Sequence, residues 1–109
     1  MNIDITDPHY SEKMKVLQAL YGVKDPELNI NIVDLGLVYD IFINEEQKKV
    51  RIEMTLSTRS CPLGGIITNH ARVAIEDELE GYEAEVELVW EPKWNYDNIS
   101  AEGRAALGL

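Results

Sequence analysis

The chain has 109 residues, 45% of them hydrophobic, and its 20 acidic and 10 basic side chains give a formal net charge of -10. This length supports one compact core and is too short for two ordinary domains, so a single domain over residues 1–109 is expected. The negative charge opposes phosphate binding, which argues against nucleic acid and favours protein partners. Neither a secretory signal nor eighteen consecutive apolar residues occur. We therefore expect a soluble cytoplasmic protein that does not bind membranes.

Cysteine occurs once, at position 61. A single cysteine excludes an internal disulfide, a CxxC redox pair and a metal site built from several cysteines of one chain. If Cys61 binds a metal, the other ligands must therefore come from elsewhere.

The N-terminal third of the chain predicts one helix followed by two turns. Apolar residues at helical spacing predict a helix that begins at Asp7-Pro8 or at Ser11. Pro26 favours a rigid turn, and residues 29–32 are expected to form a loop. Gly36 can adopt the positive φ that a second turn requires.

The middle of the chain predicts a hairpin, a helix and a further strand. Period-two alternation predicts strands over Leu37–Ile43 and Lys49–Leu56, and the short polar connection makes them antiparallel. Apolar residues at every fourth position after Cys61 predict a second helix that closes at Gly81. Alternation over Glu83–Trp90 predicts a third strand, parallel to the second because a helix connects them.

A short helix is expected to end the chain, with Asn98 or Ser100 as its cap and Gly108 as its stop. The element order α-β-β-α-β followed by this helix predicts an α+β fold. We expect a two-layer sandwich in which a small three-stranded mixed sheet has helices on one face.

Cys61 lies between a strand pattern and a helix pattern, in a stretch rich in serine, threonine and glycine. Pro62 suits the first position of the helix, so Cys61 is expected at or beside the N-cap. There the free N–H groups and the helix dipole favour a thiolate, which is both a metal ligand and a nucleophile. The alternative is a small buried hydrophobic residue, the usual role of a lone cysteine.

Neither histidine is well placed to act as a base for Cys61. His70 lies nine residues further along, about 13 Å at roughly 1.5 Å per helical residue. His9 belongs to an N-terminal segment that is expected to be mobile. A Cys-His pair for nucleophilic catalysis is therefore not expected, and both histidines are interpreted as structural or solvated.

Three acidic residues lie in the predicted turns. Asp25 and Glu27 flank Pro26 and form either a general acid/base pair or a polar turn in which Asp25 caps its own backbone. Asp34, in the second turn, has the same two interpretations.

Trp90 and Trp94 bracket Pro92 after the last predicted strand. Tryptophan is enriched in binding hot spots, so the three residues are candidates for a partner-binding surface. The alternative is that the two indoles fasten the C-terminal tail to the edge of the sheet.

Five short motifs follow one another in the chain. They are Asp25-Pro26-Glu27, Asp34-Leu35-Gly36-Leu37-Val38, the hydroxyl-rich loop into Cys61-Pro62, Trp90-x-Pro92-x-Trp94 and Ser100-x-Glu102-x-Arg104-x-x-Leu107-Gly108. Each alone is weak, but in this order they resemble the SufT/PaaD-type metal-sulfur cluster biosynthesis family from about Met14 to Leu109. The cysteine-rich C-terminal extension of many phenylacetate-pathway members does not occur here, which favours the SufT-like branch.

The resemblance implies an α+β domain that assists the maturation of iron-sulfur proteins and is not a metabolic enzyme. By position, Cys61 matches a reactive cysteine that contacts cluster or iron. Asp25 and Glu27 match the acidic turn near it, and Ser57 and Thr58 match the hydroxyls of its loop. The residues expected to shape the site around Cys61 are Asp25, Glu27, Asp34, Ser57 and Thr58.

One thiolate does not hold an iron-sulfur cluster, which usually takes about four cysteine ligands. A transient cluster or iron on Cys61 would therefore need a second protomer in a homodimer, a small thiol or a client apoprotein. The expected partners are iron-sulfur assembly proteins and client apoproteins. Two alternatives remain open: an adaptor that bridges assembly machinery and clients without touching metal, and an enzyme that uses Cys61 as a nucleophile.

Overall fold

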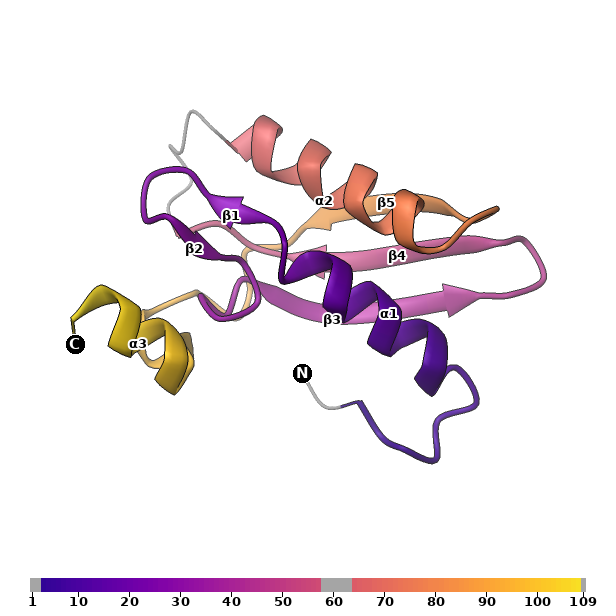
Figure 1. Cartoon of the computed structure of the whole chain (residues 1–109), viewed down its shortest axis with the longest axis horizontal. Coiled ribbons are helices and arrows are strands. Elements are labelled where there is room, and N and C mark those ends of the chain that lie inside the picture. The colour runs from indigo at the N-terminus through magenta and orange to yellow at the C-terminus, as the bar shows by residue number, and fades with distance from the viewer. Residues whose placement is uncertain (1–2, 58–63, 109) are drawn as a thin grey trace.

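The computed structural model describes residues 3–57 and 64–108 (Figure 1). Its helices are α1 (Tyr10–Leu20), α2 (Gly64–Glu78), the short 3-10 helix η1 (Tyr96–Asn98) and α3 (Ala101–Leu107). Its strands are β1 (Lys24–Asp25), β2 (Ile30–Asn31), β3 (Val38–Asn44), β4 (Lys49–Met54) and β5 (Glu83–Leu88).

The central sheet has the strand order β3-β4-β5. β3 pairs antiparallel with β4, and β4 pairs parallel with β5. Helices α1 and α2 cover one face of this sheet (Figure 1). The predicted two-layer α+β fold with a three-stranded mixed sheet and a short C-terminal helix is thereby confirmed.

The core lies between the sheet and the two long helices. Alternate residues of β4 point into the core, because side chains of a strand repeat on one face every two residues. Every fourth residue of α2 packs against them, because one face of a helix repeats about every 3.6 residues. The fully buried members include Val16, Leu20, Ile41, Val50, Ile52, Met54, Ile67, Ala71 and Ile75. Strict alternation would place Val38 on the face opposite Ile41, yet both are buried because the register shifts between Val38 and Asp40.

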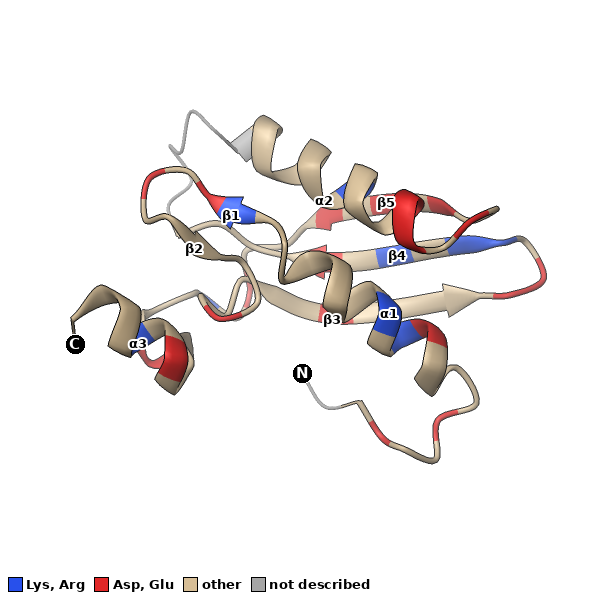
Figure 2. Ribbon diagram, viewed as in Figure 1, with Lys and Arg blue, Asp and Glu red and all other residues tan. Residues whose placement is uncertain are grey.

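The other face of the sheet remains polar. Arg51, between the buried Val50 and Ile52, contacts Glu53 at 3.1 Å and Glu87 at 2.6 Å, and its guanidinium lies 4.2 Å from the centre of the Phe42 ring. Acidic residues are also found in the β3–β4 connection and, on the helix-covered side, at the end of α2 (Figure 2). This face therefore holds exposed charges, among them the ion pairs of Arg51, and its apolar exposure includes the partly exposed Phe42.

The expected loop over residues 29–32 is wrong. Lys24 pairs with Asn31 and Asp25 with Ile30, so β1 and β2 form a small antiparallel ladder. Two-residue strands are too short to produce a detectable period of two, and the turn between them depends on Asn29 adopting a positive φ of 57°.

The three predicted strands end or begin within a few residues of their expected limits. β4 stops at Met54 and β5 at Leu88, each two residues earlier than expected. The last link between them runs from the Val89 N–H to the Met54 carbonyl at 2.9 Å. Beyond this hydrogen bond the segments that follow β4 and β5 separate, and the candidate site lies between them.

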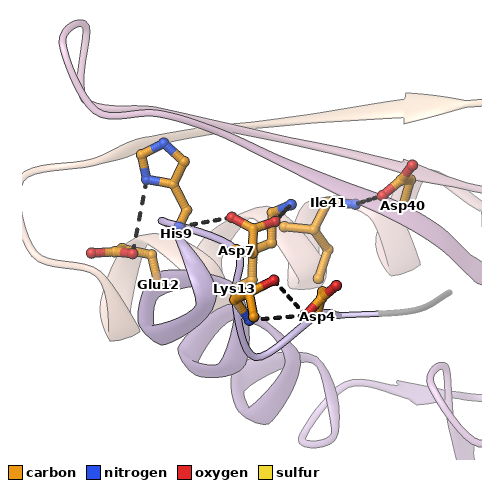
Figure 3. Close-up of polar contacts among 8 residues, drawn as sticks. Asp4, Asp7, His9, Glu12, Lys13, Asp40 and Ile41 are labelled. Atoms are coloured by element: carbon orange, nitrogen blue, oxygen red, sulfur yellow. Dashed lines mark hydrogen bonds and ion pairs between the residues drawn. The ribbon is translucent and has the colours of Figure 1, made fainter.

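The first helix begins at Tyr10, between the two expected starts (Figure 3). Asp7 organises this end of the molecule: its Oδ1 accepts from the His9 N–H at 2.7 Å and its Oδ2 from the Lys13 ammonium at 2.7 Å. At the C-terminal end, Ser100 caps α3 by accepting from the Gly103 N–H at 3.0 Å, as one of the two expected caps, and Gly108 ends the helix with a positive φ of 78°.

Candidate functional site

The candidate site lies where the chain leaves β4. Ser57 is the last residue that the structure describes before residue 64. The predicted site residues Thr58 and Cys61, with Pro62, fall outside the described residues, so their roles remain predictions. The surroundings of Ser57 define the part of the site that can be built.

A cleft of about 480 Å³ opens between the continuation of β4 and the segment that follows β5. Its lining residues are Thr55, Leu56, Ser57, Trp90, Glu91, Lys93 and Trp94. We call it the first cleft. Its size falls in the range of ligand pockets, roughly 300 to 1,000 Å³.

A second cleft of about 420 Å³ adjoins the first. It is lined by Glu27, Leu28, Ser57, Trp94, Asn95 and Tyr96. Ser57 and Trp94 line both clefts, so the two clefts meet beside the end of β4. The structure therefore brings together four of the predicted site residues, namely Glu27, Ser57, Trp90 and Trp94.

The wall that carries the tryptophans is held by contacts distant in sequence. The Tyr39 hydroxyl donates to the Pro92 carbonyl at 2.7 Å, and burial raises the pKa of the Tyr39 phenol. Pro92 has no N–H with which to continue a ladder, which fits the departure of the chain from the sheet. Pro92 does not line either cleft among the described residues; its contact with Tyr39 anchors the segment between the two indoles.

Trp94 is fixed at both its polar and its apolar ends. Its indole N–H donates to the Leu35 carbonyl at 2.7 Å, and its ring meets the Tyr96 ring edge-on with centroids 5.6 Å apart. A buried indole usually finds such a partner for its N–H. The two interpretations of this residue are therefore compatible, because Trp94 both fastens the tail and forms the shared wall of the clefts.

Asp25 lies beneath the acidic turn and does not line either cleft among the described residues. It is only 3% exposed, and its Oδ1 accepts from the N–H groups of Glu27 at 2.8 Å and Leu28 at 3.3 Å. This is the turn in which an aspartate caps its own backbone. The turn presents the exposed Glu27 side chain to the second cleft.

Asp34 is likewise engaged in hydrogen bonds. Its Oδ2 accepts from the Asn31 side-chain amide at 2.7 Å, and its Oδ1 accepts from the Ser100 hydroxyl at 2.9 Å. Sequence reasoning missed Asn31, Tyr39 and the Leu35 carbonyl as supports of the site. The contacts of Asp34, Tyr39 and Trp94 toward the C-terminal region span 53 to 66 residues, and no local pattern signals pairs that distant.

The histidines lie away from the two clefts among the described residues. His9 Nδ1 is 4.0 Å from Glu12 Oε2, and His70 lines a separate groove with Gly22 and Asp77. Over residues 3–57 and 64–108, no group of three or more His, Cys, Asp or Glu side chains is arranged to hold a metal ion. In the same part of the chain, none of the helices has the length and apolar character needed to cross a membrane.

Comparison with known proteins gives the family. Residues 13–88 match the model of the iron-sulfur cluster assembly protein family. The chain is 41% identical over 97 residues to the Fe-S protein maturation auxiliary factor YitW of Bacillus subtilis, covering 89% of this chain and 94% of the relative. It is 38% identical over 87 residues to the Fe-S protein maturation auxiliary factor SufT of Staphylococcus aureus, covering 80% and 98%.

A solved structure agrees with these matches. A domain of unknown function, DUF59, from Bacillus anthracis superposes with a TM-score of 0.85 at 34% identity, covering 91% of this chain and 93% of that one. The family match spans most of the chain, and the two relatives are covered almost completely. The chain therefore belongs to the iron-sulfur cluster assembly protein family, as the order of its motifs predicted.

Proposed function

We propose that this protein is a cytoplasmic maturation factor that accepts or passes a labile iron-sulfur cluster through Cys61 and delivers it to client apoproteins. The observation that carries the proposal is the meeting of two clefts at Ser57, four residues before the single cysteine. The relatives are named auxiliary factors and not enzymes, which fits a role in handing over cargo.

The cluster is the cargo in this proposal, and Cys61 supplies one of its ligands. Because a cluster takes about four cysteine ligands, the rest must come from a second protomer, a small thiol or the client. This arrangement suits transfer, because a thiolate of the client has to displace only one ligand, Cys61, to release the cluster from this chain. A thiolate at the start of α2 would be stabilised by the helix dipole.

The described residues would act around this thiol. Glu27 adds negative charge to the second cleft, and the rings of Trp90 and Trp94 offer aromatic surface of the kind found in binding hot spots. Pro92 holds the segment between the rings. Asp25, Ser57 and Thr58 are proposed to shape the loop that leads to the cysteine.

Anaerobic reconstitution with iron and sulfide tests the thiol. Wild type is expected to develop a labile visible chromophore and to activate an apo acceptor, and Cys61→Ser is expected to lose both. His70→Gln is the control, because His70 is exposed and lies in the separate groove. Equal transfer by wild type and Cys61→Ser would contradict a role for the thiol.

An adaptor function is the second candidate, favoured by the two tryptophans in one cleft. In this case the clefts bind assembly proteins or clients, and metal never touches the chain. Client loading in cells would then survive Cys61→Ser and fail in Trp94→Ala. The carrier predicts loss in both variants, so the cysteine variant separates the two functions.

A further inference from the structure

The Asp34 carboxylate joins two segments that are remote in sequence. One oxygen accepts from the Asn31 side chain on β2 at 2.7 Å, and the other accepts from the Ser100 hydroxyl, 66 residues away, at 2.9 Å. The backbone reinforces both links. The Asp34 N–H donates to Asn31 Oδ1 at 2.8 Å, and the Asp34 carbonyl accepts from the Ser100 N–H at 2.7 Å.

The turn over residues 31–36 (the Asp34 turn) lies so close to residues 94–108 (the C-terminal segment) that a glycine on each side leaves little room for a Cβ. A Cβ on Gly36 would overlap the backbone carbonyl of Asn98. A Cβ on Gly103 would lie 3.0 Å from the Asp34 carbonyl oxygen and 2.8 Å from Ile99 Cγ2. The Trp94 N–H, bonded to the Leu35 carbonyl, adds a third attachment to the same turn.

Each of the two joined segments carries one wall of the second cleft. β2 is paired with β1, and the turn between them presents Glu27 and Leu28. The C-terminal segment presents Trp94 and Tyr96 on the opposite side. Asp34 therefore lies behind the cleft and connects its two walls, although it does not itself line either cleft among the described residues.

We propose that Asp34 is a positioning residue that fixes the separation of the two walls of the second cleft, with Asn31 and Ser100 as its partners. It does so by accepting one hydrogen bond from each wall. As a consequence, Asp34 does not contact iron or act as an acid or base. The effect on transfer rests on the proposed function, whereas the effect on the walls does not.

An exchange of side chains separates positioning from chemistry. Asn31 and Ser100 donate to different oxygens of the Asp34 carboxylate, and in Asp34→Asn an NH₂ group replaces one of these oxygens, so one of the two donors faces another donor. Combining Asn31→Asp with Asp34→Asn restores the set: the amide oxygen at 34 accepts from Ser100, and its NH₂ donates to the carboxylate at 31. The net charge equals that of wild type, but position 34 no longer has a carboxylate.

Two readouts are measured on wild type, the single variant and the exchanged pair. The first is the hydrogen-exchange protection of the Trp94 indole N–H by NMR, with its signal assigned by its loss in Trp94→Phe. The second is cluster transfer to an apo acceptor. Asp34→Asn is expected to lower the protection by about tenfold or more, as befits loss of a hydrogen bond to a charged group, and to slow transfer.

The exchanged pair is expected to recover both readouts toward wild type. Recovery of the indole signal without recovery of transfer would mean that the carboxylate at 34 takes part in the chemistry, which overturns the proposal. Unchanged indole protection in Asp34→Asn would also overturn it. If wild type transfers no cluster, the proposed function fails, and the indole signal still decides whether Asp34 positions the walls.

Discussion

Asp7 and Asp34 each accept two hydrogen bonds through their side-chain carboxylates, but the hydrogen bonds connect residues at very different separations along the chain. Asp7 bonds to His9 and Lys13, two and six residues away, at the entrance to α1 (Figure 3). Asp34 bonds to Asn31 and to Ser100, and the second link spans 66 residues. The hydrogen-bond lengths are alike, so the two carboxylates differ in the length of the chain segment that their hydrogen bonds close into a loop.

The comparison indicates where substitutions should matter. Loss of the Asp7 contacts frees a few residues whose neighbours remain attached through the helix. Loss of the Asp34 contacts releases the C-terminal segment and with it the wall that Trp94 provides. The following predictions test this contrast, beginning with the largest expected effect.

Gly36→Ala should be the most disruptive single change at the Asp34 turn. Gly36 has a φ of 74°, and an added Cβ would overlap the Asn98 carbonyl. We expect the free energy of unfolding in urea to fall by about 3 kcal/mol, from backbone strain and overpacking together.

Gly81→Ala provides the matched control for this prediction. Gly81 has a φ of 87°, but no atom lies within 4 Å of the Cβ position, so only the backbone strain of about 1 to 2 kcal/mol should appear. Equal destabilisation by the two variants would contradict a tight contact between Gly36 and the C-terminal segment.

Ser100→Ala should have the next largest effect. The substitution removes the N-cap of α3 and leaves Asp34 Oδ1 without its Ser100 partner. The expected loss of unfolding free energy is about 1 to 2 kcal/mol. Amide exchange should increase in α3 and not in α1 or α2. Uniform acceleration throughout the protein would argue against a separable C-terminal segment.

Much of the fold could be predicted because its signals are local and periodic. β3, β4 and β5 alternate, α2 repeats every four residues, and the helix between β4 and β5 sets their parallel direction. The missed ladder of β1 and β2 has only two residues in each strand, and the geometry of a turn holds it in place. A strand of two residues spans a single period, so its sequence shows no repeat that could reveal it.

The candidate site was less predictable because its supports are long-range. The motifs drew attention to Asp34 and to the Trp90–Trp94 region, but not to the contacts that connect the Asp34 turn with Ser100 or Trp94 with Leu35. Asp25 was offered two interpretations, and the hydrogen bonds at its Oδ1 correspond to the backbone-capping one. Cys61 and Thr58 lie outside the described residues, and their roles stay predictions.

Tyr39→Phe should have a smaller effect that depends on pH. The variant loses the hydrogen bond to the Pro92 carbonyl, worth about 1 kcal/mol. Burial raises the pKa of Tyr39 in the folded protein, so the fold favours the protonated phenol. This contribution to stability is full below the unfolded pKa of about 10 and is lost as the pH rises through the folded pKa.

Urea unfolding of wild type and Tyr39→Phe across alkaline pH measures this dependence. The stability of wild type should fall more steeply than that of Tyr39→Phe above about pH 10. Tyr82→Phe is the control, since Tyr82 lies away from both clefts among the described residues. Parallel curves for wild type and Tyr39→Phe would contradict this prediction, because they would mean that folding does not change the pKa of the Tyr39 phenol.

Asp7→Asn should have the smallest effect and the opposite pH dependence. The hydrogen bond from Lys13 is the main cause that lowers the pKa of Asp7, and the His9 N–H adds to it. A lowered pKa stabilises the fold above the unfolded value near 4, and this contribution disappears as the pH falls through the folded pKa. The two proteins should therefore converge in stability in acid.

Because the contacts of Asp7 close only a short stretch of chain, Trp94 protection and cluster transfer should remain as in wild type. A loss of transfer in Asp7→Asn comparable to that in Asp34→Asn would contradict the contrast between the two carboxylates.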